Sequence, residues 1–289
     1  NRLSINISIN YPETIIGYSQ YSYTHTKDNF VNDLSKARTY TLHEDIEKMR
    51  TAGLAIGGNL NNARSTGGGG GTQTAGLIAG GLEGSSYTRK ALTEQYDGSS
   101  WTEVGDLNEA RSWSGQAGAT YTSAIIGGGS PNSSPATTNA ETWDGSSWTE
   151  VNNLNTGRVP GSGISEGSTA SLVFGGFVTP SRNDETELWN GSSWTELNDM
   201  GSAKDQLASF GTTTAGLSAG GTPVKSDVEL WDGTSWTEVN DMNTAREANP
   251  GSGSVPTTIC AGGLVGGSAK NETELFDGTS WTEVSNLNE

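Results

Sequence analysis

Histidine and cysteine, which serve as metal ligands and in nucleophilic catalysis, are scarce in this sequence. Its 289 residues include only two histidines, His25 and His43, and one cysteine, Cys260. A hydrolytic zinc site needs three protein ligands and an open position, and the chain contains no D-x-D-x-D-G calcium loop. Cys260 stands in the apolar segment T-T-I-C-A-G-G, which favours a buried structural thiol. We therefore predict no metal, no cofactor and no assignable catalytic residue.

Carboxylates are abundant instead. The chain has 33 acidic and 16 basic side chains, for a net charge of -17. Residues 1–59 hold six of each, so the remaining 27 acidic and 10 basic side chains all belong to residues 60–289. The electrostatic field of this negative charge repels phosphate backbones, so we predict no nucleic-acid partner. Acid–base chemistry by paired carboxylates stays open, although the sequence singles out no pair.

One phrase returns five times in the acidic region and indicates the elements that hold these side chains. Its versions are E-Q-Y-D-G-S-S-W-T-E-V, E-T-W-D-G-S-S-W-T-E-V, E-L-W-N-G-S-S-W-T-E-L, E-L-W-D-G-T-S-W-T-E-V and E-L-F-D-G-T-S-W-T-E-V. The second aromatic falls at Trp101, Trp148, Trp194, Trp236 and Trp281, a period of 42 to 47 residues that is typical of propeller blades. Asp-Gly or Asn-Gly predicts a hairpin turn within each phrase, and we expect the tryptophans to pack between blades.

Each repeat has three further parts. It opens with a link of the form L/M-N-x-A-R, continues into a short apolar strand that closes in a glycine pair, and then enters a variable polar loop. With the hairpin this predicts four strands per repeat and a mainly β fold. We expect a five-bladed propeller with blades at about 60–106, 107–153, 154–199, 200–241 and 242–286.

The repeat resembles the kelch family over residues 60–289. The shared features are the glycine pair ending the second strand, the aromatic-Asp ending the third, the Trp in the fourth and the small-plus-Arg link. The resemblance implies a kelch-like β-propeller, in a family that mostly binds other molecules and includes some copper oxidases. Copper favours imidazole ligands, and residues 60–289 contain no histidine, so we predict no oxidase. The near-identical copies are also similar to kelch-like arrays of phage and bacteria.

Alternate connections of an antiparallel blade emerge on the same side, so the links and the variable loops are expected to share one face. We expect the link cations to form structural salt bridges with their neighbours Asp106, Asn153, Asp199 and Asp241. An exposed aromatic beside a cation suits a protein or glycan ligand. The candidate ligand-binding residues are Tyr87, Arg89, Lys90, Trp113, Arg182, Lys225 and Lys270.

Residues 1–59 do not repeat, and they predict a small α/β segment. Alternating apolar residues over 3–9 predict a strand, and the patterns over 27–36 and 42–52 predict two helices.

The phrases N-Y-P-E-T-I-I-G, A-R-T-Y and G-L-A-I-G-G-N-L-N-N-A of this first segment resemble the second domain of UDP-3-O-acyl-N-acetylglucosamine deacetylase, the zinc enzyme of lipid A synthesis. The resemblance implies that Thr39 and Tyr40 line the substrate site. The family's H-K-x-x-D zinc ligands are absent, and neither His25 nor His43 occupies that motif. We therefore predict no deacetylase turnover.

Together these patterns favour a non-catalytic binding or scaffolding propeller that recognises protein or glycan through its loop face. A propeller hydrolase that uses face carboxylates, or a relict, incomplete zinc deacetylase, stays open as the alternative. The absence of a long apolar run predicts no membrane span, and we expect a virion or cell-surface location. The ends, Asn1 and the repeat-like Leu287-Asn288-Glu289, lead us to expect a chimeric fragment.

Overall fold

A computed structural model describes residues 58–114, 120–132, 136–159, 162–248 and 251–287. The chain divides into two compact units, residues 1–56 and residues 57–289. The strand predicted over residues 3–9 and the helices predicted over 27–36 and 42–52 lie outside the described residues. The described strands all belong to the second unit.

Each sequence repeat forms one antiparallel sheet whose strands pair in chain order. The first contains β2 (Gly68–Thr72), β3 (Ala75–Ala79), β6 (Thr93–Tyr96) and β7 (Trp101–Glu103). The second has three strands, β9 (Ala124–Gly127), β11 (Ala140–Trp143) and β12 (Trp148–Val151). The third contains β13 (Ser162–Ser165), β14 (Ser171–Phe174), β17 (Thr186–Trp189) and β18 (Trp194–Glu196).

The last two repeats have the same plan. The fourth sheet contains β19 (Ala208–Thr212), β20 (Ala215–Ala219), β21 (Val228–Trp231) and β22 (Trp236–Val239). The fifth contains β23 (Gly251–Ser254), β24 (Thr257–Ala261), β27 (Thr273–Phe276) and β28 (Trp281–Val284). All pairings in these sheets are antiparallel, so the predicted hairpin order within repeats is confirmed.

Short two-residue strands form four accessory sheets from the links and loops. They are β1 (Arg64–Ser65) with β4 (Leu82–Glu83) and β5 (Thr88–Arg89), β8 (Arg111–Ser112) with β10 (Ser130–Pro131), β15 (Phe177–Val178) with β16 (Ser181–Arg182), and β25 (Leu264–Val265) with β26 (Ser268–Ala269). The link and the variable loop of a repeat pair in the first two of these sheets, which supports their predicted position on one side.

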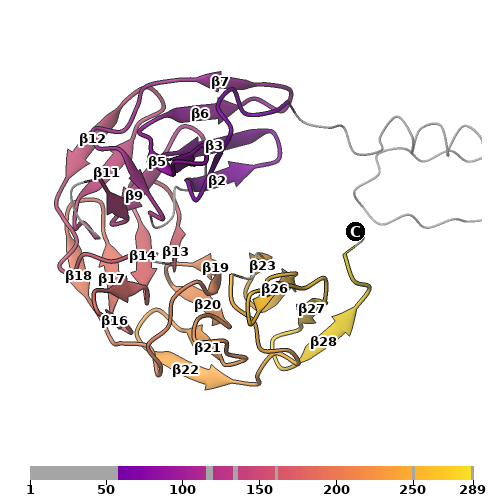
Figure 1. Ribbon diagram of the computed structural model, residues 1–289. Coiled ribbons are helices and arrows are strands. Elements are labelled where there is room, and N and C mark those ends of the chain that lie inside the picture. The colour runs from indigo at the N-terminus through magenta and orange to yellow at the C-terminus, as the bar shows by residue number, and fades with distance from the viewer. Residues whose placement is uncertain (1–57, 115–119, 133–135, 160–161, 249–250, 288–289) are drawn as a thin grey trace, which may run out of the picture. The chain divides into compact units, whose positions relative to one another are not determined.

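The sheets of the second unit succeed one another along an arc, from β2–β7 at one end to β23–β28 at the other (Figure 1). The described residues contain strands and no helix, so the mainly β prediction is confirmed for them. No strand among them pairs the first large sheet with the last, so a closed, five-bladed arrangement stays a prediction. None of the described segments is a helix long and apolar enough to cross a membrane.

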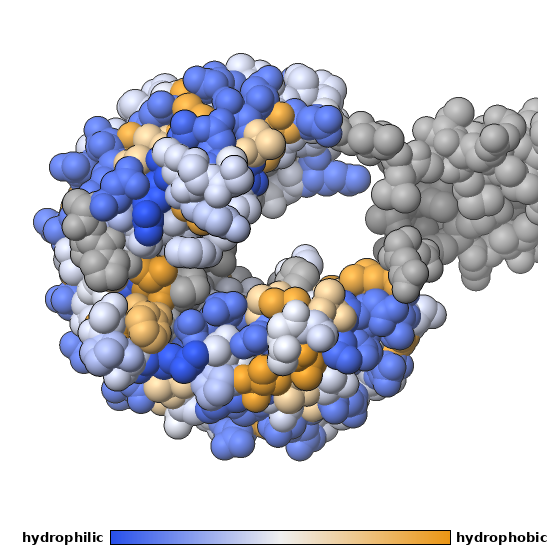
Figure 2. All heavy atoms as spheres, viewed as in Figure 1, coloured by the Kyte–Doolittle hydropathy of each residue, from blue (hydrophilic) through white to orange (hydrophobic). Residues whose placement is uncertain are grey.

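Four apolar clusters fill the spaces between consecutive sheets. Leu77 and Trp148 join the first pair, Ile125 and Trp189 belong to the second, and the third and fourth clusters have the same pattern. In each repeat the two aromatic residues of the hairpin lie opposite each other, with ring centroids 5.1 to 5.4 Å apart. Trp148, Trp194 and Trp281 are buried within these clusters, and the partly buried Trp236 packs against one, so the predicted packing role is confirmed for four of the five repeated tryptophans. Trp101 of the first sheet is partly buried and belongs to none of the four clusters. Polar residues cover most of the visible outer rim (Figure 2).

The glycine pairs join one repeat to the next. Gly80 and Gly81 both have positive φ, 68° and 109°, and so do the corresponding pairs in the other four repeats. Gly81 donates its N–H to the carbonyl of Arg111 at 2.8 Å, and a Cβ on Gly80 would lie 2.5 Å from that same oxygen. Glycine is required there because only glycine combines this backbone conformation with so close an approach.

Candidate functional site

A buried glutamate lies at the same position of every main sheet, on its next-to-last strand. These residues are Glu94, Glu141, Glu187, Glu229 and Glu274, and their side chains are at most 3% exposed. Each forms an ion pair with the cation of its link, namely Arg64 (3.1 Å), Arg111 (2.6 Å), Arg158 (2.7 Å), Lys204 (3.2 Å) and Arg246. The prediction that these cations pair with Asp106, Asn153, Asp199 and Asp241 is wrong. The cations point inward, where an unpaired charge is far more costly than at the surface.

The link asparagine completes this glutamate junction. In the third repeat Asn155 donates both its backbone N–H (2.7 Å) and its Nδ2 (2.9 Å) to Oε2 of Glu187. Arg158 Nη2 donates to the other oxygen, Oε1, at 2.7 Å. Asn61, Asn108 and Asn243 make the same two bonds in their own repeats. In these four repeats a buried carboxylate is thus enclosed by donors and has a structural role.

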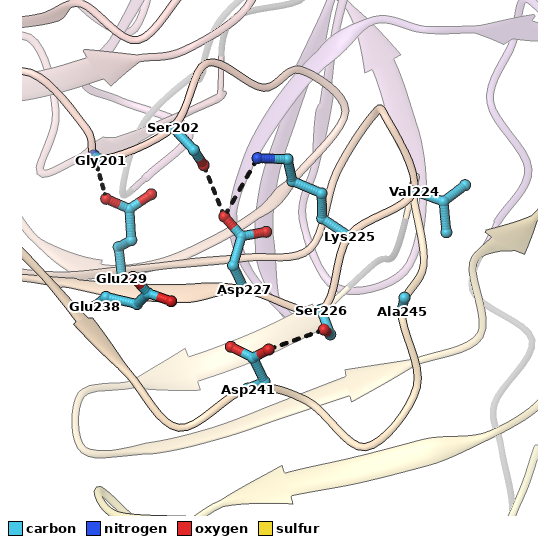
Figure 3. Close-up of a pocket in the computed structure, with 10 residues that line it drawn as sticks. All are labelled: Gly201, Ser202, Val224, Lys225, Ser226, Asp227, Glu229, Glu238, Asp241 and Ala245. Atoms are coloured by element: carbon cyan, nitrogen blue, oxygen red, sulfur yellow. Dashed lines mark hydrogen bonds and ion pairs between the residues drawn. The ribbon is translucent and has the colours of Figure 1, made fainter.

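The fourth repeat departs from this pattern because its link reads M-G-S-A-K. Gly201 stands where the others have asparagine, and Lys204 stands where they have arginine. Gly201 still donates its N–H to Glu229 Oε2, at 2.6 Å, but it has no amide side chain to add. An open pocket of about 410 Å³ lies at this junction, lined by Gly201, Ser202, Val224, Lys225, Ser226, Asp227, Glu229, Glu238, Asp241 and Ala245 (Figure 3).

The pocket is rich in carboxylates. Glu229 lies directly opposite Glu238 in the β21–β22 ladder, so two like charges share one face. Asp227 accepts a hydrogen bond from Ser202 Oγ at 2.7 Å and pairs with Lys204 at 3.2 Å and Lys225 at 3.7 Å. Burial opposes ionisation of Asp227, but Lys204, Ser202 and Lys225 outweigh it and lower its pKa. Four carboxylates therefore face two ammonium groups.

Two buried carboxylate oxygens of this pocket have no hydrogen-bond partner, Oδ1 of Asp227 and Oε1 of Glu229. Glu229 Oε1 lies 3.2 Å from Lys204 Nζ, within ion-pair range but without a hydrogen bond. Sequence reasoning missed this site. The signal was present as the departure of M-G-S-A-K from the consensus link, yet nothing in one sequence shows that the missing side chains faced a single buried carboxylate.

The predicted loop residues do not form one cluster. Arg89 donates to the carbonyl and the hydroxyl of Ser130 at 2.8 Å, and Lys90 pairs with Glu83. Arg182 pairs with Asp205 at 2.6 Å, which leaves these cations engaged within the molecule.

The other predicted residues have separate environments. Tyr87 is 69% exposed and Trp113 is 39% exposed, while Lys270 is half-buried and donates its backbone N–H to Gly263. Lys225 lines the pocket of the fourth repeat. Thr39 and Tyr40 lie outside the described residues.

The described residues do not fit a hydrolytic zinc ion. They contain no histidine, and their single cysteine, Cys260, is buried. No group of three or more His, Cys, Asp or Glu side chains within the described ranges could hold a metal. The repeat unit thus offers no donor set of the kind that zinc hydrolases use, and we derive no zinc-dependent step from it.

Comparison with known proteins shows what the first part of the chain is similar to. Residues 1–77 match the family model of LpxC, UDP-3-O-acyl N-acetylglycosamine deacetylase. The UDP-3-O-acyl-N-acetylglucosamine deacetylase of Campylobacter fetus is 40% identical over 58 residues, which is 20% of either chain. Those of Nautilia profundicola and Actinobacillus succinogenes are 31% and 39% identical over 62 residues, 22% of this chain and 21% and 20% of theirs.

These matches bear on both predictions of function. The chain spans about a fifth of the length of the curated relatives it matches. The similarity to the deacetylase family predicted from residues 1–63 is confirmed, and it extends to residue 77. The prediction of a non-catalytic binding or scaffolding propeller that recognises protein or glycan through its loop face is wrong, because the similarity found is to an enzyme family. That prediction rested on the repeats, whose distinctive cations serve mainly internal ion pairs.

Proposed function

We propose that this chain carries an incomplete deacetylase element in residues 1–77 that contacts an acylated UDP-N-acetylglucosamine. The observation that carries the proposal is the match of these residues to the deacetylase family. Thr39 and Tyr40 stand in A-R-T-Y, which aligns with the A-R-T-F of the family, and we assign them to the substrate. The reaction of the matched enzymes is removal of an N-acetyl group, and the zinc they use has no fitting ligand set among the described residues.

Substrate titration of the full chain tests this proposal. We expect saturable calorimetric binding of UDP-3-O-acyl-N-acetylglucosamine, with no release of acetate in the presence of added zinc. Tyr40→Ala should weaken binding about tenfold or more, the effect of losing roughly 1.4 kcal/mol of contact energy. Thr41→Ala is the matched control, since this adjacent threonine falls outside the aligned motif, and its affinity should not change. Absence of binding by the full chain would refute the proposal, and acetate release with bound zinc would refute its incompleteness.

We further propose that residues 60–289 form a five-bladed, kelch-like propeller with blades at about 60–106, 107–153, 154–199, 200–241 and 242–286. The order of the sheets along an arc and the apolar clusters between successive sheets support it. Cysteines introduced at exposed positions of the first and fifth sheets, such as Thr102→Cys and Thr282→Cys, provide a distance test by electron spin resonance. A short, narrow distance distribution is expected for a closed ring, whereas a broad, long one would contradict closure.

A further inference from the structure

The five glutamate junctions form an internal series in which one member has lost its donors. In the third repeat Glu187 receives an amide N–H from Asn155 and a guanidinium N–H from Arg158 in addition to a backbone N–H. In the fourth repeat Glu229 keeps the backbone N–H of Gly201 and an ion pair with Lys204. Oε2 of Glu229 therefore has one donor where Oε2 of Glu187 has two. Oε1 of Glu229 has only the ion pair, whereas Oε1 of Glu187 accepts hydrogen bonds from Arg158 and, at 3.2 Å, from the backbone N–H of Thr156.

Glu229 cannot recover these donors easily from the solvent around the protein, because the residue is only 2% exposed. A buried carboxylate oxygen without a hydrogen bond is costly, and Oε1 of Glu229 is one such oxygen. The junction opens into the pocket of the fourth repeat, on the side where Gly201 lacks a side chain (Figure 3). A bound group with several N–H donors there would donate to Oε2, as the asparagine amide does in the other repeats, and to Oε1, which lacks a hydrogen bond.

In three of the other junctions the asparagine amide donates to a second acceptor besides the glutamate. The asparagine amide also donates to the main-chain carbonyl of the hairpin tryptophan, to Trp101 at 2.9 Å, Trp148 at 3.2 Å and Trp281 at 3.1 Å. Gly201, which has no side chain, cannot make such a bond to Trp236, the equivalent residue. A group that replaces the asparagine amide at the fourth junction must therefore donate at least two hydrogen bonds, and it need not accept any.

The charge of the pocket determines whether a neutral amide or a cation is the better ligand. Asp227, Glu229, Glu238 and Asp241 line the pocket, and the ammonium groups nearby are those of Lys204 and Lys225. Asp227 Oδ1 adds a second buried oxygen without a hydrogen bond. A primary ammonium group carries three N–H donors, no acceptor and a positive charge, so it complements this surface better than an amide does.

We propose that the pocket of the fourth repeat binds small organic primary ammonium ions, whose N–H groups take the place of the asparagine amide found in the other four repeats. This site is independent of the deacetylase-like segment, so either proposal can fail without the other.

Nuclear magnetic resonance titration of the full chain with methylammonium chloride tests the site, with ionic strength held constant by sodium chloride. We expect saturable shifts of the backbone N–H signals of Gly201 and Ser202. Tetramethylammonium has the same charge but no N–H donor, so it should bind about tenfold more weakly or worse. Acetamide has the donors without the charge and should also bind more weakly.

Gly201→Asn is the decisive variant, because it supplies the amide present in the other repeats and should fold. Its φ is not in the left-handed region, and an added Cβ would approach Glu229 Oε2 at 3.2 Å, a contact that a small movement relieves. We expect the methylammonium shifts to be lost. Equal binding by this variant, equal binding of tetramethylammonium, equal binding of acetamide, or no saturable shift in the wild-type chain would each overturn the proposal.

Discussion

The glutamate junctions of the third and fourth repeats occupy the same place in the fold but have different surroundings. Glu187 is enclosed by the amide of Asn155 and the guanidinium of Arg158. Glu229 has Gly201 and Lys204 at those positions and borders an open pocket. Two substitutions in a link thus convert a structural ion pair into a candidate binding site while the β frame around it is kept. A repeat protein can vary chemistry at one junction because its neighbours maintain the fold.

Removing the link cation should lower the free energy of unfolding by different amounts at these two junctions, and this is the largest expected effect. Arg158→Ala leaves Glu187 buried without its charge partner, which should lower the free energy of unfolding by about 3–5 kcal/mol. Lys204→Ala should cost less, because Lys204 Nζ lies 3.2 Å from Glu229 Oε1 without a hydrogen bond, whereas Arg158 donates to Glu187 at 2.7 Å. Urea denaturation monitored by tryptophan fluorescence measures both. Equal losses at the two junctions would show that the guanidinium hydrogen bond adds no stability beyond that of the ion pair.

Restoring the consensus asparagine at the fourth junction should raise the free energy of unfolding, by less than removal of a link cation lowers it. Gly201→Asn adds an amide donor to a charged, buried acceptor, so we expect stabilisation by about 1–2 kcal/mol, near the lower range for hydrogen bonds to charged groups. The reverse change, Asn155→Gly, is the matched control and should destabilise the third repeat by a similar amount. The same denaturation experiment serves for both variants, and a destabilised Gly201→Asn would contradict the assigned geometry.

The hairpin turns provide the smallest and most local comparison between repeats. Backbone N–H groups of Ser100 and Ser99, with the Ser99 hydroxyl, hold the pKa of Asp97 at about 2, and Ser147 and Ser146 do the same for Asp144. The third repeat has Asn190 at this position, and its side chain accepts the equivalent backbone bonds without titrating.

The lowered pKa of these turn aspartates determines the direction of a pH effect. A group whose pKa is lower in the folded state stabilises the fold above its unfolded pKa of about 3.9, and this stabilisation is lost as the pH falls toward 2. Asp97→Asn should therefore flatten the dependence of the thermal midpoint on pH between about 4 and 2. Asn190→Asp, the matched control, should steepen it. No change in slope for either variant would contradict the role of these hydrogen bonds.

Local features of the fold could be predicted directly from sequence patterns. The Asp-Gly turn and the glycine pair that closes the second strand depend on backbone conformation over a few residues. The period predicted one main sheet per repeat, and the described residues contain five such sheets. The second aromatic of each phrase was also predicted to pack between sheets, since a repeat cannot bury its apolar face alone.

Contacts between parts of a repeat were harder to predict. Arg158 follows the amide residues Asn152, Asn153 and Asn155 in the chain, yet it pairs with Glu187, 29 positions away, and with Glu185. The sequence by itself determined the repeats, their turns and the similarity of residues 1–63 to the deacetylase family. Only the tertiary structure decided which carboxylate each link cation meets and that Gly201 leaves one of them open, because ion pairing and burial depend on distances between segments far apart in the chain.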